Sequence, residues 1–213
     1  MLELGCGTGE IARRLAPSVE RVDAVDPSRA MIQVGERLPG GDEENLNWIP
    51  ASAETFDYPV QYALIVVARS IHWMDWEQVF PMMRQALTAN GRLAIVDSLS
   101  DRGGWDEAAL SAIIGRYSTN QDFLRLDLFG ELEKRQLFDL EERVATVPVT
   151  MEQSIDSYIE FYHSTSTLGR GVMGEESAAR FDKEMRAAFE PHARLSFEVT
   201  VEVAWGQPRA RSA

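Results

Sequence analysis

The chain has 213 residues, of which 45% are hydrophobic and 26% charged, a composition typical of a globular protein with one sizeable core. Its formal net charge of −13 disfavours binding to nucleic acid or to an anionic membrane surface, and Arg13-Arg14 and Arg209/Arg211 are expected to be solvated surface or tail. No apolar run reaches membrane-spanning length, and the single cysteine, Cys6, excludes an internal disulfide. We therefore expect a cytoplasmic protein without a nucleic-acid or membrane partner.

The first half alternates between patterns typical of strands and of helices. The predicted strands are residues 1–4, 22–26, 46–51, 62–68 and 92–97, and the predicted helices between them are residues 11–15, 27–38 and 76–87. Ala89-Asn90-Gly91 suits a left-handed cap that ends the third helix. This alternation predicts an open, doubly wound α/β sheet.

The second half is less regular. Helical periodicity covers residues 105–117, 154–163 and 175–189, while residues 140–150 have mixed strand character and residues 196–205 alternate as a strand with one wet face. Residues 101–119 and 164–171 are candidate mobile loops, and we leave open whether either serves as a lid. We expect a single domain over residues 1–213, with a cofactor-binding half at 1–99 and a substrate-side half at 100–213.

The most informative segment is MLELGCGTGE at residues 1–10. A short apolar run, glycine at every second position and then a helix-forming stretch predict a strand that turns sharply into a helix, the unit with which α/β proteins bind nucleotide-like cofactors. A dinucleotide site would have its third glycine where Glu10 stands, and an acid at the helix start opposes a pyrophosphate. The spacing therefore disfavours a dinucleotide.

The acid and glycines, Glu3-x-Gly5-x-Gly7-x-Gly9, resemble motif I of the class I S-adenosylmethionine-dependent methyltransferases. That resemblance implies a mostly parallel, seven-stranded Rossmann-like sheet whose last strand is antiparallel. It also implies S-adenosyl-L-methionine as cofactor, a molecule without phosphate that presents a sulfonium and an ammonium. Asn90-Gly91-Arg92-Leu93 resembles the family's turn before the fifth strand.

Two further segments extend the resemblance. Asp26 ends the second predicted strand, where the family and the dinucleotide folds alike have an acid for the ribose hydroxyls. Ser52-Ala53-Glu54 resembles the family's "D-A-E" segment that reads adenine, with serine in place of aspartate. For Glu3 the alternative is capping of the loop amides, and for Met31 it is core packing. The resemblance implies a cofactor site made of Glu3, Gly5, Cys6, Gly7, Gly9, Asp26, Pro27, Met31, Ser52, Ala53, Glu54 and Ala68.

The substrate side is expected after the fourth strand. Residues 68–75, ARSIHWMD, resemble the "A-L-H-W-F-D" segment of methyltransferases similar to trans-aconitate methyltransferases, which act on small molecules. The implied acceptor-binding residues are Arg69, Ser70, His72, Trp73 and, further along, Arg170. His72 is the candidate general base for a hydroxyl acceptor, whereas a carboxylate acceptor needs only a cation to hold it. The alternative is that His72 and Trp73 only build the loop.

The predicted reaction is methyl transfer to an oxygen of a small molecule, without a metal, since no cluster has metal-ligand spacing. Family members usually carry one or two helices before the first strand, so we expect uncovered apolar surface and self-association here. Two alternatives stay open: a non-catalytic methyltransferase-like scaffold, and an NAD-dependent or nucleotide-sugar enzyme, which Gly9-Glu10 disfavours.

Overall fold

The computed structural model describes residues 1–101, 107–119, 128–165, 167–190 and 194–209. The chain folds into two compact units. The first unit comprises Met1–Ser98, Leu126–Thr146 and Val201–Ala213, and the second comprises Leu99–Arg125 and Val147–Thr200. Each unit has hydrophobic clusters of its own.

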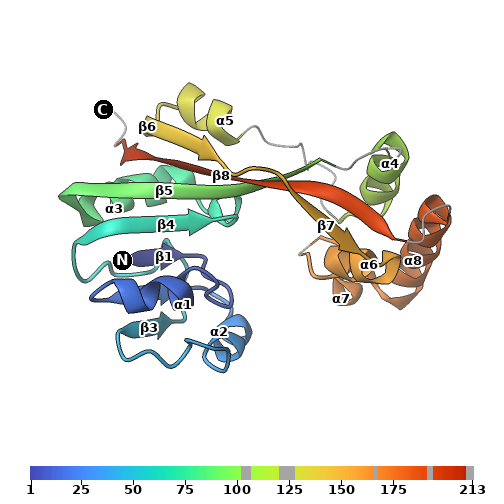
Figure 1. The fold of residues 1–213 in the computed structure, drawn as a ribbon, viewed down its shortest axis with the longest axis horizontal. Coiled ribbons are helices and arrows are strands. Elements are labelled where there is room, and N and C mark those ends of the chain that lie inside the picture. The colour runs from blue at the N-terminus through green and yellow to red at the C-terminus, as the bar shows by residue number, and fades with distance from the viewer. Residues whose placement is uncertain (102–106, 120–127, 166, 191–193, 210–213) are drawn as a thin grey trace. The chain divides into compact units, whose positions relative to one another are not determined.

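A largely parallel sheet forms the centre of the first unit. In order across the sheet, its parallel strands are β3 (Leu46–Ile49), β2 (Val22–Val25), β1 (Leu2–Leu4), β4 (Tyr62–Ala68) and β5 (Leu87–Asp101). Figure 1 shows β1, β4 and β5 side by side. The chain proceeds outward from β1 to β3 and then returns to β4 on the other side of β1, so the strand order reverses between β1 and β4. Open α/β sheets bind ligands outside the strand ends at this reversal.

Three antiparallel strands complete the sheet. β8 (Leu195–Pro208) is the neighbour of β5, and it pairs antiparallel with β6 (Phe138–Ala145) and β7 (Val149–Gln153). The doubly wound sheet with an antiparallel last strand is therefore confirmed. The described residues contain eight strands and not seven, because the region expected as one strand at 140–150 forms two. Pro148 stands between them, where the ring removes a backbone donor and interrupts the ladder.

Helices flank the sheet of the first unit, and side-chain caps begin two of them. They are α1 (Ala12–Leu15), the 3₁₀ turn η1 (Ala16–Ser18), α2 (Arg29–Gly35), η2 (Ile71–Trp73), α3 (Trp76–Ala86) and α5 (Leu128–Lys134). Ser28 accepts a hydrogen bond from the Met31 amide to begin α2, and Asp75 accepts one from the Glu77 amide to begin α3.

The predicted boundary between the third helix and the fifth strand was wrong. α3 ends at Ala86 and β5 begins at the next residue, so Asn90 and Gly91 lie inside a strand and do not form a left-handed cap. A Cβ on Gly91 would lie 2.7 Å from the Tyr62 carbonyl oxygen. Close approach of two strands, and not a helix end, therefore explains this glycine.

The second unit contains α4 (Glu107–Tyr117), α6 (Ile155–His163), α7 (Arg170–Met173), α8 (Glu175–Phe189), β7 and the first residues of β8. Its helices share a hydrophobic core, which includes Ile159, Phe181 and Met185. Of the candidate mobile loops, residues 102–106 and residue 166 lie outside the described residues.

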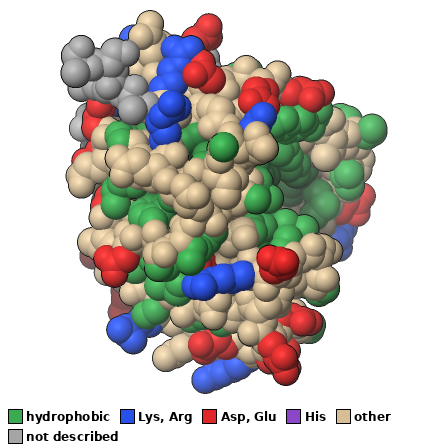
Figure 2. Space-filling view, turned by 90° about the vertical axis from the view of Figure 1, so that its left-hand side faces the viewer, with side chains coloured by type: hydrophobic (Ala, Val, Ile, Leu, Met, Phe, Trp, Pro, Cys, Tyr) green, Lys and Arg blue, Asp and Glu red, His purple; other side chains and the backbone are tan. Residues whose placement is uncertain are grey.

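The surface mixes charges of both signs. Figure 2 shows acidic and basic side chains scattered over one face of the molecule, with hydrophobic side chains between them. Within the described part of the chain, no helix has the length and apolarity needed to cross a membrane.

Candidate functional site

The glycine loop follows β1 at the point where the strand order reverses. Gly5, Gly7 and Gly9 have φ angles of 70°, 56° and 72°, a left-handed backbone that other residues adopt only under strain. The Gly5 amide donates to the Val25 carbonyl at 2.8 Å, and the Gly9 amide donates to the Cys6 carbonyl at 2.8 Å. The alternating glycines thus form a compact bend outside the carboxyl ends of β1 and β2.

Asp26 links this loop to the start of α2. Its Oδ2 accepts from the Gly7 amide at 2.8 Å and its Oδ1 accepts from the Ser28 amide at 2.8 Å. The side chain is 9% exposed, while Pro27 beside it is exposed. Because each carboxylate oxygen accepts more than one hydrogen bond, both oxygens keep capacity for a further donor such as a ribose hydroxyl.

Glu3 and Cys6 lie beneath the loop. Glu3 is 2% exposed and its Oε2 accepts from the Ala12 amide at 2.8 Å, which caps the first turn of α1. Burial raises the pKa of Glu3 to about 7, assisted by Asp26 and Glu10 and opposed by the Ala12 amide. Burial, together with Glu3 and Asp26, also raises the pKa of the Cys6 thiol, which keeps it protonated and unreactive.

Met31 lies over the loop and is not part of the core. Its side chain is 43% exposed, and its Cε is 3.5 Å from the position that a Cβ on Gly7 would take. A flexible thioether next to the glycine bend offers an apolar surface to a planar ligand.

Trp48, which no sequence motif singles out, packs against the same bend at Gly9. Its ring atoms occupy the space where a Cβ on Gly9 or Gly35 would lie, and its Nε1 donates to the Gly41 carbonyl at 2.9 Å. Gly9 therefore serves close packing as well as the turn. No local pattern identifies this partner, because Trp48 arrives from β3.

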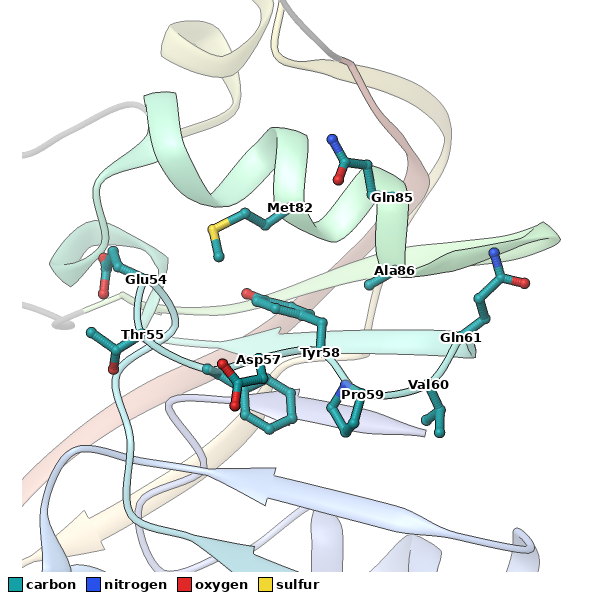
Figure 3. Close-up of a pocket in the computed structure, with 11 residues that line it drawn as sticks. Glu54, Thr55, Asp57, Tyr58, Pro59, Val60, Gln61, Met82, Gln85 and Ala86 are labelled. Atoms are coloured by element: carbon teal, nitrogen blue, oxygen red, sulfur yellow. The ribbon is translucent and has the colours of Figure 1, made fainter.

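The segment after β3 is held by short polar contacts. Ser52 Oγ and Thr55 Oγ1 are 3.1 Å apart, the Ala53 carbonyl accepts from the Tyr58 hydroxyl, and Glu54 Oε1 accepts from the Asp75 amide at 2.9 Å. Glu54 also lines a hollow of about 600 Å³ between residues 54–61 and α3. Figure 3 shows Met82 of α3 and the Tyr58 ring on facing sides of it. Among the predicted cofactor residues, Glu54 alone lines this hollow.

The loop after β4 separates a buried residue from exposed ones. Ser70 is buried, its Oγ donates to the Leu4 carbonyl at 2.8 Å, and a Cβ on Gly5 would overlap its side chain. Ser70 therefore supports the glycine loop. Arg69, which follows the half-buried Ala68, is exposed with a left-handed φ of 52°, and its amide donates to the Val96 carbonyl.

His72 faces a second hollow, of about 330 Å³. Its lining residues are His72, Met74, Asp75, Trp76, Glu77 and Arg135. The Arg135 guanidinium lies over the Trp76 ring, 5.0 Å from its centroid, and the rings of His72 and Trp73 are 4.8 Å apart. Partial desolvation lowers the pKa of His72, Asp97 opposes this and Arg69 adds to it. A neutral imidazole at pH 7 is the form that a general base requires.

Arg135 and Asp97 were not identified from the sequence. Arg135 follows α5, about 60 positions after His72 along the chain, and Asp97 lies near the end of β5. Neither belongs to a motif, so only the folded chain brings them to the loop after β4.

Arg170 lies in the second unit and is engaged by carboxylates. Its guanidinium donates to Asp182 Oδ2 at 3.0 Å and also binds Glu160. An anionic ligand at Arg170 would have to compete with both. Among the described residues, no group of three or more His, Cys, Asp or Glu side chains could hold a metal ion.

Comparisons of the sequence with known proteins match part of the chain. Residues 1–91 match the family model described as a methyltransferase domain. A malonyl-[acyl-carrier protein] O-methyltransferase of Ilyobacter polytropus is 26% identical over 140 residues, 63% of this chain and 51% of that protein. An uncharacterised methyltransferase of Mycobacterium tuberculosis is 34% identical over 124 residues, 54% of this chain and 46% of that protein. The chain thus spans about half the length of these curated relatives.

Solved structures resemble the fold over the whole chain. A structure from Anaeromyxobacter dehalogenans described as a type II methyltransferase has a TM-score of 0.61 at 24% identity, covering 97% of this chain and 88% of that one. An S-adenosylmethionine-dependent methyltransferase from Thiobacillus denitrificans, in complex with S-adenosyl-L-homocysteine, has a TM-score of 0.55 at 16% identity, covering 97% and 84%. At these identities the likeness shows the fold. Residues 1–91 of the chain are thus similar to a methyltransferase domain, and the fold is that of the solved methyltransferase structures.

Proposed function

We propose that the protein binds S-adenosyl-L-methionine at the glycine loop and transfers its methyl group to an oxygen of a small molecule. The observation that carries this proposal is Asp26 bonded to the Gly7 amide, beside a bend of three left-handed glycines. Asp26 can accept from the ribose hydroxyls of a nucleoside, a contact that S-adenosylmethionine and a dinucleotide share. Glu10, which stands where a dinucleotide site has its third glycine, disfavours a diphosphate at the start of α1.

Some residues of the first unit would bind the cofactor, and others would bind the acceptor. When bound, the sulfonium cofactor supplies an activated methyl group whose bonding electrons return to sulfur as the new oxygen–carbon bond forms. His72 would take the proton from a hydroxyl acceptor, since its lowered pKa favours the neutral form. Arg135, which lines the same hollow as His72, and the exposed Arg69 at the end of β4 would hold a carboxylate acceptor, which needs no base. Alignment of acceptor and methyl group supplies most of the acceleration.

An oxygen acceptor is supported by one relative. The Ilyobacter polytropus protein is described as a malonyl-[acyl-carrier protein] O-methyltransferase. We extend to this chain only the class of acceptor atom. We also propose that residues 1–99 hold the cofactor and that residues 100–213 contribute to the acceptor side.

We further propose that the protein is cytoplasmic, because its single cysteine, the buried Cys6, is a free thiol.

Calorimetry with S-adenosylmethionine, S-adenosylhomocysteine and NAD tests the cofactor. We expect the first two to bind and NAD to fail, and NAD binding alone would overturn the proposal. Formation of S-adenosylhomocysteine over a panel of small carboxylic acids and phenols then tests turnover. Cofactor binding without turnover on any acceptor would favour the non-catalytic scaffold.

Self-association remains a prediction. Several large hydrophobic side chains of the first unit are exposed, including Val34, Val60 and Trp73. Sedimentation velocity over a range of protein concentrations tests it, and a constant monomer mass would contradict it.

The proposal also excludes nucleic acid as a partner. An unchanged electrophoretic mobility of DNA and RNA in the presence of the protein at low salt would support this exclusion.

A further inference from the structure

Arg13 and Arg14 are neighbours in sequence, but their surroundings in the folded chain differ. Both were expected to be solvated. The Arg14 side chain is 77% exposed, as expected, whereas the Arg13 side chain is 8% exposed and lies under the glycine loop. A buried guanidinium is costly unless its donors are satisfied, so the contacts of Arg13 need an explanation.

The Arg13 guanidinium joins two backbone segments. Nε donates to the Thr8 carbonyl at 3.0 Å, and Nη1 donates to the Pro39 carbonyl at 2.7 Å. Nη2 binds Glu10, an exposed residue that also pairs with Arg14. Two of the three partners are therefore neutral carbonyls, one in the glycine loop and one after α2.

The contact between Arg13 and the Thr8 carbonyl lies within the glycine loop. Thr8 lies between Gly7 and Gly9, both in the left-handed region, where the backbone has the greatest freedom when no ligand is bound. Asp26 fixes the Gly7 amide from one side. The Arg13 Nε bond fixes the Thr8 carbonyl, and the bond from Arg13 Nη1 to Pro39 ties the Arg13 side chain to the segment that follows α2.

We propose that Arg13 is a positioning residue for the cofactor: it holds the Thr8 carbonyl so that the glycine loop keeps its bound shape before the ligand arrives. The inference rests on the proposed function. Ordering a loop on binding weakens affinity, whereas a loop that is ordered in advance does not incur this cost. Loss of Arg13 should therefore weaken cofactor binding and leave the rate at saturation unchanged.

The chain offers matched variants. Arg13→Met removes both carbonyl contacts, Arg13→Lys keeps the charge and one donor, and Arg14→Met removes a neighbouring arginine that touches neither carbonyl. Glu10→Gln weakens the ion pair while leaving both carbonyl bonds possible. Full-length variants are titrated with S-adenosylmethionine by calorimetry, and their kcat and KM are measured.

We expect the Kd of Arg13→Met to rise tenfold or more, on the order of what loss of a hydrogen bond to a charged group costs, with kcat unchanged. Arg13→Lys should recover part of the affinity. Arg14→Met and Glu10→Gln should stay within about threefold of the wild type. A merely structural role would lower the fraction of binding-competent protein instead, leaving Kd intact.

Hydrogen exchange of residues 5–10 in the unliganded protein gives a readout independent of the cofactor. Exchange in this loop should rise in Arg13→Met and not in Arg14→Met. Equal Kd values for these two variants, or equal loop exchange, would overturn the inference. If the wild type binds no S-adenosylmethionine, the proposed function fails, and the loop exchange still decides whether Arg13 orders the loop. If Arg13→Met does not fold, Arg13→Lys and Glu10→Gln carry the same comparison.

Discussion

Glu3 combines two properties that rarely coincide in a carboxylate. It is almost wholly enclosed, and the group that donates to it is a neutral backbone amide, that of Ala12. Enclosure raises its pKa from the ordinary value of 4.5 to about 7. The folded chain therefore retains a proton on Glu3 at a pH where the unfolded chain has lost it.

The first prediction concerns the pH dependence of this group. Between pH 4.5 and 7 the folded state binds more protons at Glu3 than the unfolded state, so the stability contributed there falls as pH rises and levels off above 7. Glu3→Gln keeps an oxygen acceptor for the Ala12 amide and cannot ionise. Relative to wild type, it should gain about 3 kcal/mol of unfolding free energy from pH 4.5 to 8.

Urea unfolding of both proteins at several pH values measures this difference, in which the other titrating groups cancel. A difference that does not change with pH would show that Glu3 ionises normally in the folded protein.

Two acids of the second strand region have separate roles. Asp23 is fully buried and accepts from the Tyr62 hydroxyl at 2.6 Å, from Arg21 and from Asn47 at 2.9 Å. Asp26, three residues later, lies at the glycine loop. The sequence identifies Asp26 by its place at a strand end, but it cannot identify the Asp23 contacts, which come from three different parts of the chain.

The second prediction separates these roles. Tyr62→Phe removes a donor from a buried carboxylate and should lower the unfolding free energy by about 2 kcal/mol without changing the Kd for S-adenosylmethionine. Asp26→Asn should weaken cofactor binding about tenfold or more. Calorimetry and urea unfolding of both variants check this. A cofactor defect in Tyr62→Phe as large as that in Asp26→Asn would contradict it.

At the scale of elements, two helical glycines differ in their tertiary surroundings, which the local sequence does not predict. Gly35 ends α2, and a Cβ there would lie 2.5 Å from a Trp48 ring atom and 2.7 Å from the Thr8 carbonyl oxygen. Gly115 lies within α4, and among the described residues no atom beyond its chain neighbours and the adjacent helix backbone lies within 4 Å of such a Cβ. Helix propensity alone treats the two glycines alike.

The third prediction is that alanine acts oppositely at the two positions. Gly115→Ala should raise the unfolding free energy by about 0.5–1 kcal/mol, since alanine is the better helix former. Gly35→Ala should lower it by about 1–3 kcal/mol, because the backbone of the glycine loop and the Trp48 ring must move. Thermal or urea unfolding gives both values. Stabilisation by Gly35→Ala would show that Trp48 repacks without cost.

Elements with local signals were predicted well from the sequence. Strands β1, β2 and β4 and the glycine bend depend on residues within one turn of each other, whereas β5 is longer than the predicted residues 92–97. Gly91 was misread because its constraint is the Tyr62 carbonyl on a neighbouring strand. Trp48 and Arg13 were missed for the same reason: their partners are fixed by tertiary packing, which leaves no periodic pattern.

At the scale of the whole molecule, the chain contains separate hydrophobic clusters in its two units. The cluster of the second unit includes Tyr158, Phe181 and Met185, and it shares no residue with the clusters of the first unit. No linker-like composition marks the division in the sequence, because the chain enters and leaves the second unit twice. The division of the chain into two units therefore depends on tertiary packing, which the sequence pattern does not show.

Asp182 is the polar centre of the second unit. Its Oδ1 is 2.6 Å from His163 Nε2, its Oδ2 accepts from Arg170 at 3.0 Å, and His163 Nδ1 is 2.8 Å from the Leu168 carbonyl. Burial would raise the pKa of Asp182, but the contacts with His163 and Arg170 outweigh it and lower the pKa. The ionised carboxylate thus joins α6, α7 and α8.

The fourth prediction is that loss of this carboxylate loosens the second unit alone. Asp182→Asn leaves His163 and Arg170 without their shared anion, so about 3 kcal/mol of local stability should be lost. Hydrogen exchange over residues 155–189 should then be roughly a hundredfold faster. Asp156→Asn, which breaks an exposed pair with Arg186, should change exchange by less than about threefold. Because the two units have separate clusters, exchange in β1, β2 and β4 should stay at the wild-type rate in both variants. Equal acceleration in those strands would mean that the chain opens as one cooperative unit.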